Sequence, residues 1–156
     1  MTEHLIQILM GGLGSLGFNI LFNIRGRKLI IATLGGLISW TVFLLLAPVF
    51  PGEPLRYFFA AAAITVYGEV FARMEKTPTT TFLVPSVIPL IPGGSLYYTM
   101  NYALNKQWAA FSHRGFYTIQ LALSLAVGII AVTTLTRLLT AARKQLHKAE
   151  VFSHFH

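Results

Sequence analysis

The residues with the clearest chemical potential lie together in one apolar stretch of the chain. This stretch contains three prolines and a glycine pair, in the order Pro85, Pro89, Pro92 and Gly93-Gly94. Each proline removes a backbone donor and clashes with the preceding helical turn, and glycine leaves the backbone unconstrained. We therefore expect a helix in this stretch to break at Pro92-Gly93-Gly94.

A broken helix inside lipid has a specific chemical use. Unpaired backbone groups are tolerated there only where they line a cavity or pack against protein, and transporters place substrates at such breaks. Ser95 is expected to cap the second half-helix, whose free amides would attract an anion. Tyr97 and Asn101 follow on one helical face and could bind a small polar solute. The alternatives are a kinked helix or a tight turn between two short helices.

Two further polar features lie outside this stretch. Small and polar residues recur every four positions near the N-terminus, and they are Gly11, Ser15, Asn19 and Asn23. This spacing puts them on one face of a helix, where small residues favour close packing and asparagines can bond across the contact. Asn19 and Asn23 are therefore expected either to pack or to complete a substrate site beside the break.

Glu69 is the one acid inside a predicted span. Acids within a membrane are functional candidates by default, and Glu69 could carry a proton. Arg73 lies four residues later, at a spacing that allows a local ion pair at the membrane edge. Both roles, proton carrier and helix anchor, stay open.

Other chemistries have little support in the sequence. We find no Ser-His-Asp set, phosphate loop or carboxylate pair, there is no cysteine, and the five histidines have no metal-ligand spacing within the apolar segments. The sequence therefore predicts no enzyme, no catalytic residue, no metal site and no cofactor.

Composition places these residues in a membrane. The 156 residues are 54% hydrophobic, with a mean hydropathy of +0.64 and 11% charged residues. Soluble domains carry about 25% charged residues. The net charge of +7 could indicate nucleic acid, but the basic residues lie in short breaks between apolar runs. We therefore predict an all-α polytopic membrane protein that binds no nucleic acid.

About five transmembrane helices are expected, the fourth broken at the Pro-Gly-Gly motif. Their approximate ranges are Leu5–Ile24, Leu29–Phe50, Tyr57–Ala72, Thr81–Leu104 and Gly115–Leu139. Residues 1–139 would form one membrane domain, and residues 140–156 a basic, amphipathic tail at the membrane surface. Small or polar stripes on the first, third and fifth spans predict association with other membrane chains.

The basic residues predict the orientation. With five spans, nine basic residues fall on one side, Arg25, Arg27, Lys28, Arg73, Lys76, Arg137, Arg143, Lys144 and Lys148. The other side receives three, Arg56, Lys106 and Arg114. The positive-inside rule then puts the N-terminus outside and the C-terminus in the cytoplasm. A re-entrant fourth segment would leave four spans and reverse this result for one end.

Two stretches carry a resemblance to a known family. They are Gly17-Phe-Asn-Ile-Leu-Phe-Asn-Ile24, followed by basic residues, and Phe82-Leu-Val-Pro-Ser-Val-Ile-Pro-Leu-Ile-Pro-Gly-Gly-Ser95. Over nearly its whole length the chain resembles the C-terminal membrane half of the threonine/serine exporter family. That family often has proline where Arg25 stands here. In many bacteria this half is a separate small protein paired with a larger membrane partner, and one enteric pair is described as a succinate exporter.

The resemblance implies a membrane subunit of a secondary exporter in the bacterial inner membrane. Its substrates would be small carboxylate-bearing solutes, either threonine/serine-like amino acids or succinate-like dicarboxylates. Its partners would be the larger subunit, further copies of itself, or both. A non-transporting assembly subunit and a passive channel remain alternatives, and the broken helix favours the exporter.

Overall fold

The structure is a computed structural model that describes residues 2–153, with side chains described for residues 2–142. Its regular elements are α1 (Thr2–Leu21), α2 (Arg27–Leu45), α3 (Glu53–Met74), α4 (Thr80–Val87), the short 3₁₀ helix η1 (Ile88–Leu90), α5 (Gly93–Leu104) and α6 (Trp108–Ser153). Every regular element in this part of the chain is a helix, which confirms the predicted all-α fold.

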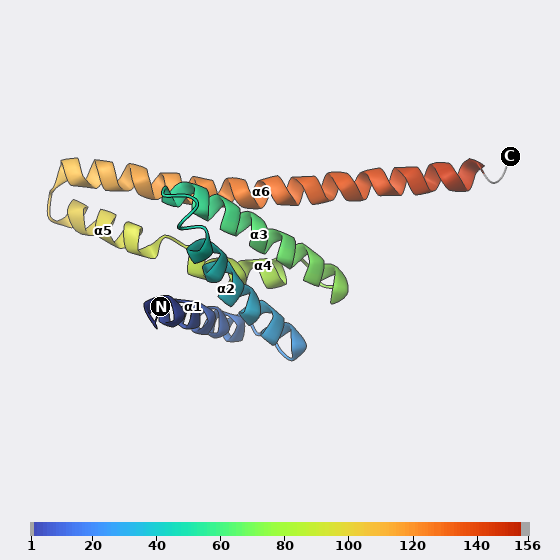
Figure 1. Ribbon diagram of the computed structural model, residues 1–156, viewed down its shortest axis with the longest axis horizontal. Helices are drawn as coiled ribbons and strands as arrows, with labels where there is room; N and C mark the ends of the chain where they lie inside the picture. The colour runs from blue at the N-terminus through green and yellow to red at the C-terminus, as the bar shows by residue number, and fades with distance from the viewer. Residues whose placement is uncertain (1, 154–156) are drawn as a thin grey trace.

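Four helices are long and apolar enough to cross a membrane: α1, α2, α3 and α6 over Trp108–Ala142. The segments Thr80–Leu90 and Gly93–Leu104 form a fifth apolar unit that is bent by 54° at a short break. This arrangement confirms a polytopic membrane protein whose fourth unit is broken. The last helix is longer than predicted, because α6 continues without interruption past residue 140 (Figure 1).

The first helix begins and ends earlier than predicted, and its last residue, Leu21, precedes Asn23. The Asn23 amide donates to the Ile20 carbonyl at 3.0 Å, and the Ile24 amide donates to the Asn19 carbonyl at 3.0 Å. Asn23 has a φ of 56°. These are the bonds of a Schellman motif, in which asparagine is one of the few residues that tolerate the left-handed conformation. Asn23 therefore terminates α1, and it does not continue the polar stripe of that helix.

Three neighbouring helices place side-chain hydroxyls against the same turn of α2. Ser15 Oγ of α1 donates to the Ala32 carbonyl at 3.3 Å, and Ser86 Oγ of α4, which donates to the Phe82 carbonyl of its own helix at 2.6 Å, lies 3.4 Å from the same Ala32 carbonyl. The Tyr67 hydroxyl of α3 donates to the Ile31 carbonyl at 2.8 Å. These carbonyls belong to the buried face of α2, so α2 is the central helix on which α1, α3 and α4 pack.

Glycines make this close approach possible. A Cβ added at Gly36 would fall on the Ser15 side chain, and one added at Gly35 would fall on the Ser86 side chain. A Cβ at Gly12 would fall on Leu37 in the same way. Small residues at helix contacts are the main way for membrane helices to pack tightly, because water does not drive their association.

The third and sixth helices form a second contact, on the other side of α3 (Figure 1). A Cβ on Gly128 would approach Ala61 to 3.1 Å, so this glycine also marks a close contact. The small and polar stripe of the third span is buried within this chain, and its members are Ala61, Thr65, Gly68 and Ala72. The helix α5 packs along the first part of α6 and extends away from α2.

We expect Gly36→Val to destabilise the chain by about 1–3 kcal/mol, the usual cost of overpacking a filled core. The added side chain would meet Ser15 and force α1 away from α2. The measurement is thermal unfolding in detergent, monitored as the fraction of protein that remains monodisperse after heating. Gly14→Val is the matched control, because a Cβ at Gly14 would meet nothing within 4 Å. Equal losses in the two variants would show that the α1–α2 contact is not tight.

Candidate functional site

The three prolines occupy different parts of the broken fourth unit. Pro85 lies buried inside α4, Pro89 lies in η1, and Pro92 is the N-cap residue of α5. Neither Pro89 nor Pro92 can donate to the carbonyl four residues earlier; α4 tightens into η1 at Pro89, and the chain leaves helical geometry before Pro92. The interruption falls at Ile91 and Pro92. The predicted break is confirmed, but Gly93 and Gly94 are the first residues of α5 and are helical.

Ser95 does not cap α5, so that prediction is wrong. It is the third residue of the helix, and its Oγ lies 2.8 Å from Thr118 Oγ1 of α6. Thr99, one turn further along, lies 3.1 Å from the same oxygen. Ser95 therefore joins α5 to α6. The predicted capping role requires Ser95 to be the residue before the helix. In the structure that position is occupied by Pro92, three residues earlier, so Ser95 lies within the first turn.

The break presents bare backbone at the surface of the chain. The first helical bond of α5 runs from the Leu96 amide to the Pro92 carbonyl at 3.0 Å, so the amides of Gly94 and Ser95 have no partner within the helix. Gly93 and Gly94 are exposed, and a Cβ at either would meet nothing within 4 Å.

Gly93, Tyr97 and Asn101 recur every four residues, so they form one stripe along α5. All three are exposed, with 66% of Tyr97 accessible. The Asn101 side-chain oxygen accepts a bond from Asn105 Nδ2 at 3.0 Å. Ser95 lies on the opposite side of α5, against α6. The structure thus brings together most of the predicted residues of α5 on an open face, which we call the α5 stripe.

The two asparagines of the first span are not part of this stripe. Asn19 is fully buried between α1 and α2, where its Nδ2 donates to Thr33 Oγ1 at 3.1 Å. Its Oδ1 is buried without a hydrogen-bond partner among the residues that the structure describes. Asn23 is exposed, and its Oδ1 accepts from Arg25 Nε at 2.8 Å. Asn23 lies beside Pro85 of α4, with which it lines a common cavity.

Glu69 has the local partner that the sequence suggested. Its Oε2 lies 3.5 Å from an Arg73 nitrogen, and its Oε1 accepts a bond from Thr79 Oγ1 at 3.3 Å. Arg73 also donates to Thr140 of α6 at 3.3 Å. Glu69 therefore ties the end of α3 to the segment before α4 and, through Arg73, to α6. These contacts are the ones that an anchoring role requires.

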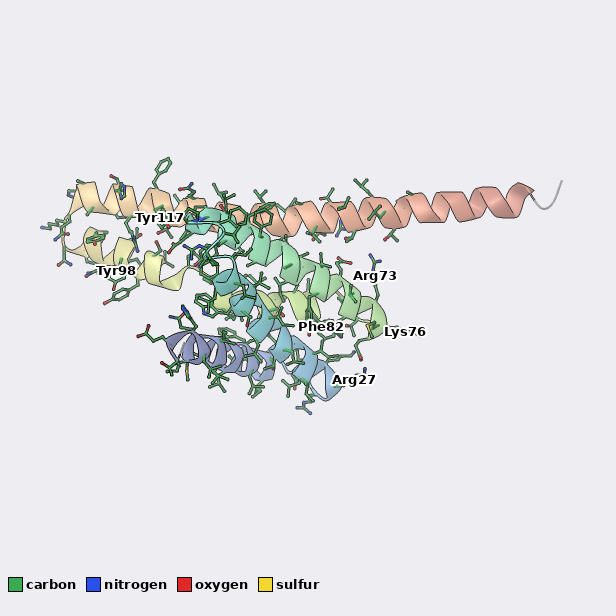
Figure 2. The ribbon with its side chains drawn as sticks, viewed as in Figure 1. Arg27, Arg73, Lys76, Phe82, Tyr98 and Tyr117 are labelled. Atoms are coloured by element: carbon green, nitrogen blue, oxygen red, sulfur yellow. The ribbon has the colours of Figure 1, made fainter. Side chains whose placement is uncertain are left out.

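The charged ends of the helices lie apart from the aromatic end. Figure 2 shows Arg27, Arg73 and Lys76 at one end of the helices and Tyr98 at the other. At the charged end, Arg27 lies 3.3 Å from Glu75, which links the start of α2 to the end of α3. Between them, the ion pairs of Glu69 and Glu75 fix the end of the molecule where α1, α2, α3 and α4 meet.

Two features of the site were not anticipated from the sequence. One is Thr118 of α6, whose hydroxyl lies within hydrogen-bond distance of the Ser95 and Thr99 hydroxyls of α5. The other is the pair Thr80 and Thr81, which faces the turn between α1 and α2 across a cavity. The run Thr77-Pro-Thr-Thr-Thr81 is unusually rich in hydroxyls for a membrane segment, and this composition was the available signal.

The chain was compared with known proteins. No curated protein and no solved structure matches it. The model of the family described as "Threonine/Serine exporter, ThrE" matches residues 7–135, which include most of α1, all of α2 to α5 with the break, and most of the membrane part of α6. A match over this much of the chain shows that the protein belongs to the threonine/serine exporter family of membrane transporters.

Proposed function

We propose that the chain is the small subunit of a secondary exporter for carboxylate-bearing solutes, and that it works with a larger membrane partner. Threonine/serine-like amino acids and succinate-like dicarboxylates both fit, because both carry the carboxylate on which the proposal depends. The observation that carries the proposal is the exposed start of α5 in a membrane-spanning chain, where the α5 stripe lies beside Gly94, whose amide has no partner within the helix.

Exposure of this kind is costly in lipid. A backbone group left without a hydrogen bond in hydrocarbon costs several kcal/mol, so non-helical backbone at this depth needs protein or water beside it. The stripe also carries Asn101, whose amide group is polar. A second membrane chain that covers α5 would remove this cost, and further copies of this chain could do so as well.

Such a partner would also complete a substrate site. The amides of Gly94 and Ser95 point along the axis of α5 at its N-terminus, where partial positive charge attracts an anion. Tyr97 and Asn101 lie on the adjoining face and would bond to polar groups of the solute. The prolines Pro85, Pro89 and Pro92 hold the two halves of the broken unit at their angle. The proposed substrate therefore binds between α5 and the partner.

Export requires that the solute is loaded from the cytoplasm. The distribution of basic residues supports one orientation of the chain in the membrane. The ends of α1 and α3, the start of α2 and the far end of α6 lie on one side of the molecule (Figure 1). Nine basic residues belong to these ends. We propose that this side faces the cytoplasm of a bacterial cell, with the N-terminus outside.

The second candidate function is an assembly subunit that transports nothing. It is favoured by the same exposed stripe, because a partner could cover α5 without leaving room for a solute. A passive channel would also expose polar groups along a path. These alternatives differ from the exporter in the response of transport and assembly to a change at Gly93.

We expect Gly93→Leu to leave the fold of this chain intact and to abolish efflux from liposomes that contain it with its partner. The leucine has open space in the isolated chain, so only a solute or a neighbouring chain can meet it. Gly14→Leu is the matched control, because Gly14 also has nothing within 4 Å of a Cβ. The measurements are co-purification of the partner and efflux of labelled threonine and succinate.

Each result has a distinct meaning for the stripe. Lost efflux with the partner still bound supports the substrate site. Loss of both efflux and partner binding supports a partner surface and the assembly subunit. Full efflux by Gly93→Leu would remove the substrate site, and efflux that ignores an imposed proton gradient would favour the channel.

Glu69→Gln tests whether the carboxylate carries a proton or anchors the helix end. Its contacts with Arg73 and Thr79 support anchoring, so we expect proton-driven efflux to continue, with a loss of about 0–1 kcal/mol in stability, as is usual for partly exposed ion pairs. Glu75→Gln, which breaks the pair with Arg27, is the control. Efflux that no longer depends on the proton gradient in Glu69→Gln alone would assign proton transfer to Glu69.

A further inference from the structure

A cavity of about 500 Å³ lies at the charged end of the molecule, between the α1–α2 turn and the start of α4. Its polar lining comes from both sides. Asn23, Arg25 and Lys28 belong to the turn and the first residues of α2, and Thr80 and Thr81 belong to α4. A cavity of this volume is in the usual range for small-molecule sites.

The cavity is positively charged. Its lining contains two cationic side chains and no acid. Among the side chains that the structure describes, the ion pairs are Arg27 with Glu75 and Arg73 with Glu69, so neither Arg25 nor Lys28 has its charge neutralised by an acid. Of these three neighbouring basic residues, Arg27 is paired with an acid and lies outside the cavity, whereas Arg25 and Lys28 line the cavity without an acidic partner.

The guanidinium of Arg25 bonds to the residue that ends the first helix. Asn23, in the left-handed conformation that ends α1, accepts from Arg25 Nε at 2.8 Å. This bond uses Nε and leaves the two terminal NH₂ groups for another acceptor. Arginine binds carboxylates through such paired donors, and a threonine hydroxyl can add a further bond to the same oxygen. The donors that line the cavity therefore suit a small oxyanion.

We propose that this cavity is the cytoplasmic loading site of the exporter, in which Arg25 and Lys28 bind the carboxylate of the solute before it reaches the break. The proposal rests on the function and orientation proposed above. The apolar part of the lining, which includes Pro85 and Val84 of α4, fits the short carbon chain of an amino acid or a dicarboxylate. The loading site and the α5 stripe lie on the two halves of the same broken unit.

The test compares three neighbouring arginine and lysine residues in the full complex. Arg25→Gln and Lys28→Gln each remove a charge from the cavity, and Arg27→Gln removes one outside it. Transport is measured as uptake of succinate or threonine into inverted phosphatidylcholine liposomes, in which the cytoplasmic face is outside. We expect KM to rise roughly tenfold in the two cavity variants, as for loss of a charged hydrogen bond, and less than twofold in Arg27→Gln. Vmax should change little.

The same cations could bind the phosphate of an anionic lipid, and a second measurement separates the two ligands. Phosphatidylglycerol is titrated into the liposomes, and the lipid that co-purifies with each variant is quantified. Lipid that co-purifies with the wild type and not with Arg25→Gln, together with an unchanged KM, would overturn the proposal in favour of a lipid site. Equal KM changes in all three variants would overturn it in favour of general surface charge.

Failure of this assignment is distinguishable from failure of the proposed function. A wild-type complex that transports neither succinate nor threonine removes the exporter of carboxylates, together with its loading site. A wild-type complex that transports them, with KM unchanged in Arg25→Gln and Lys28→Gln, removes the loading site alone. Co-purification of the partner with each variant confirms that the complex has assembled.

Discussion

The packing of this protein depends on how closely its helices approach α2. A glycine pair, Gly35-Gly36, removes the side chains that would separate α2 from α1 and α4. The backbone of α2 is then near enough for Ser15 and Ser86 to bond to the Ala32 carbonyl. In lipid there is no water to release from apolar surfaces, so close packing and such bonds provide the stabilisation that a soluble core obtains from burial. A larger residue at Gly35 or Gly36 would weaken both the close packing and the hydrogen bonds on α2.

This constraint determines which half of the broken unit is held and which is open. The first half, α4, is fixed by Ser86 on α2 and by Leu83, which approaches the Cβ position of Gly68 to 3.5 Å. The second half, α5, does not reach Gly35-Gly36 of α2. It is attached to α6 through Ser95 and Thr118. The break at Pro92 thus separates a rigidly packed segment from one with an uncovered face. A path along this unit would have α4 as its fixed side and the uncovered face of α5 as its open side.

The sequence predicted the features that depend on local chemistry. The prolines remove backbone donors and a glycine pair follows Pro92, so a break in this stretch was predictable although α4 continues through Pro85, and Glu69 and Arg73 are neighbours on any helix. Features that depend on helix register or on distant segments were not predictable. Ser95 faces α6 because the helix starts at Pro92, three residues before it, and its partner Thr118 is 23 residues away. Asn23 left the predicted stripe because the Schellman turn ended α1 at Leu21.

Polar residues in a membrane protein serve packing or function, and the structure separates the two by their hydrogen bonds. Ser15, Ser86 and Tyr67 bond within the bundle, so packing accounts for them. The Gly94 amide at the start of α5 has no partner within its helix, and Arg25 and Lys28, at the charged end of the molecule, have no acidic partner among the side chains that the structure describes. The amide begins the second half of the broken unit, and the two cations face its first half across the cavity. Under the function proposed above, an anion that enters at the basic end and passes beside α5 would bond to each of these groups in turn.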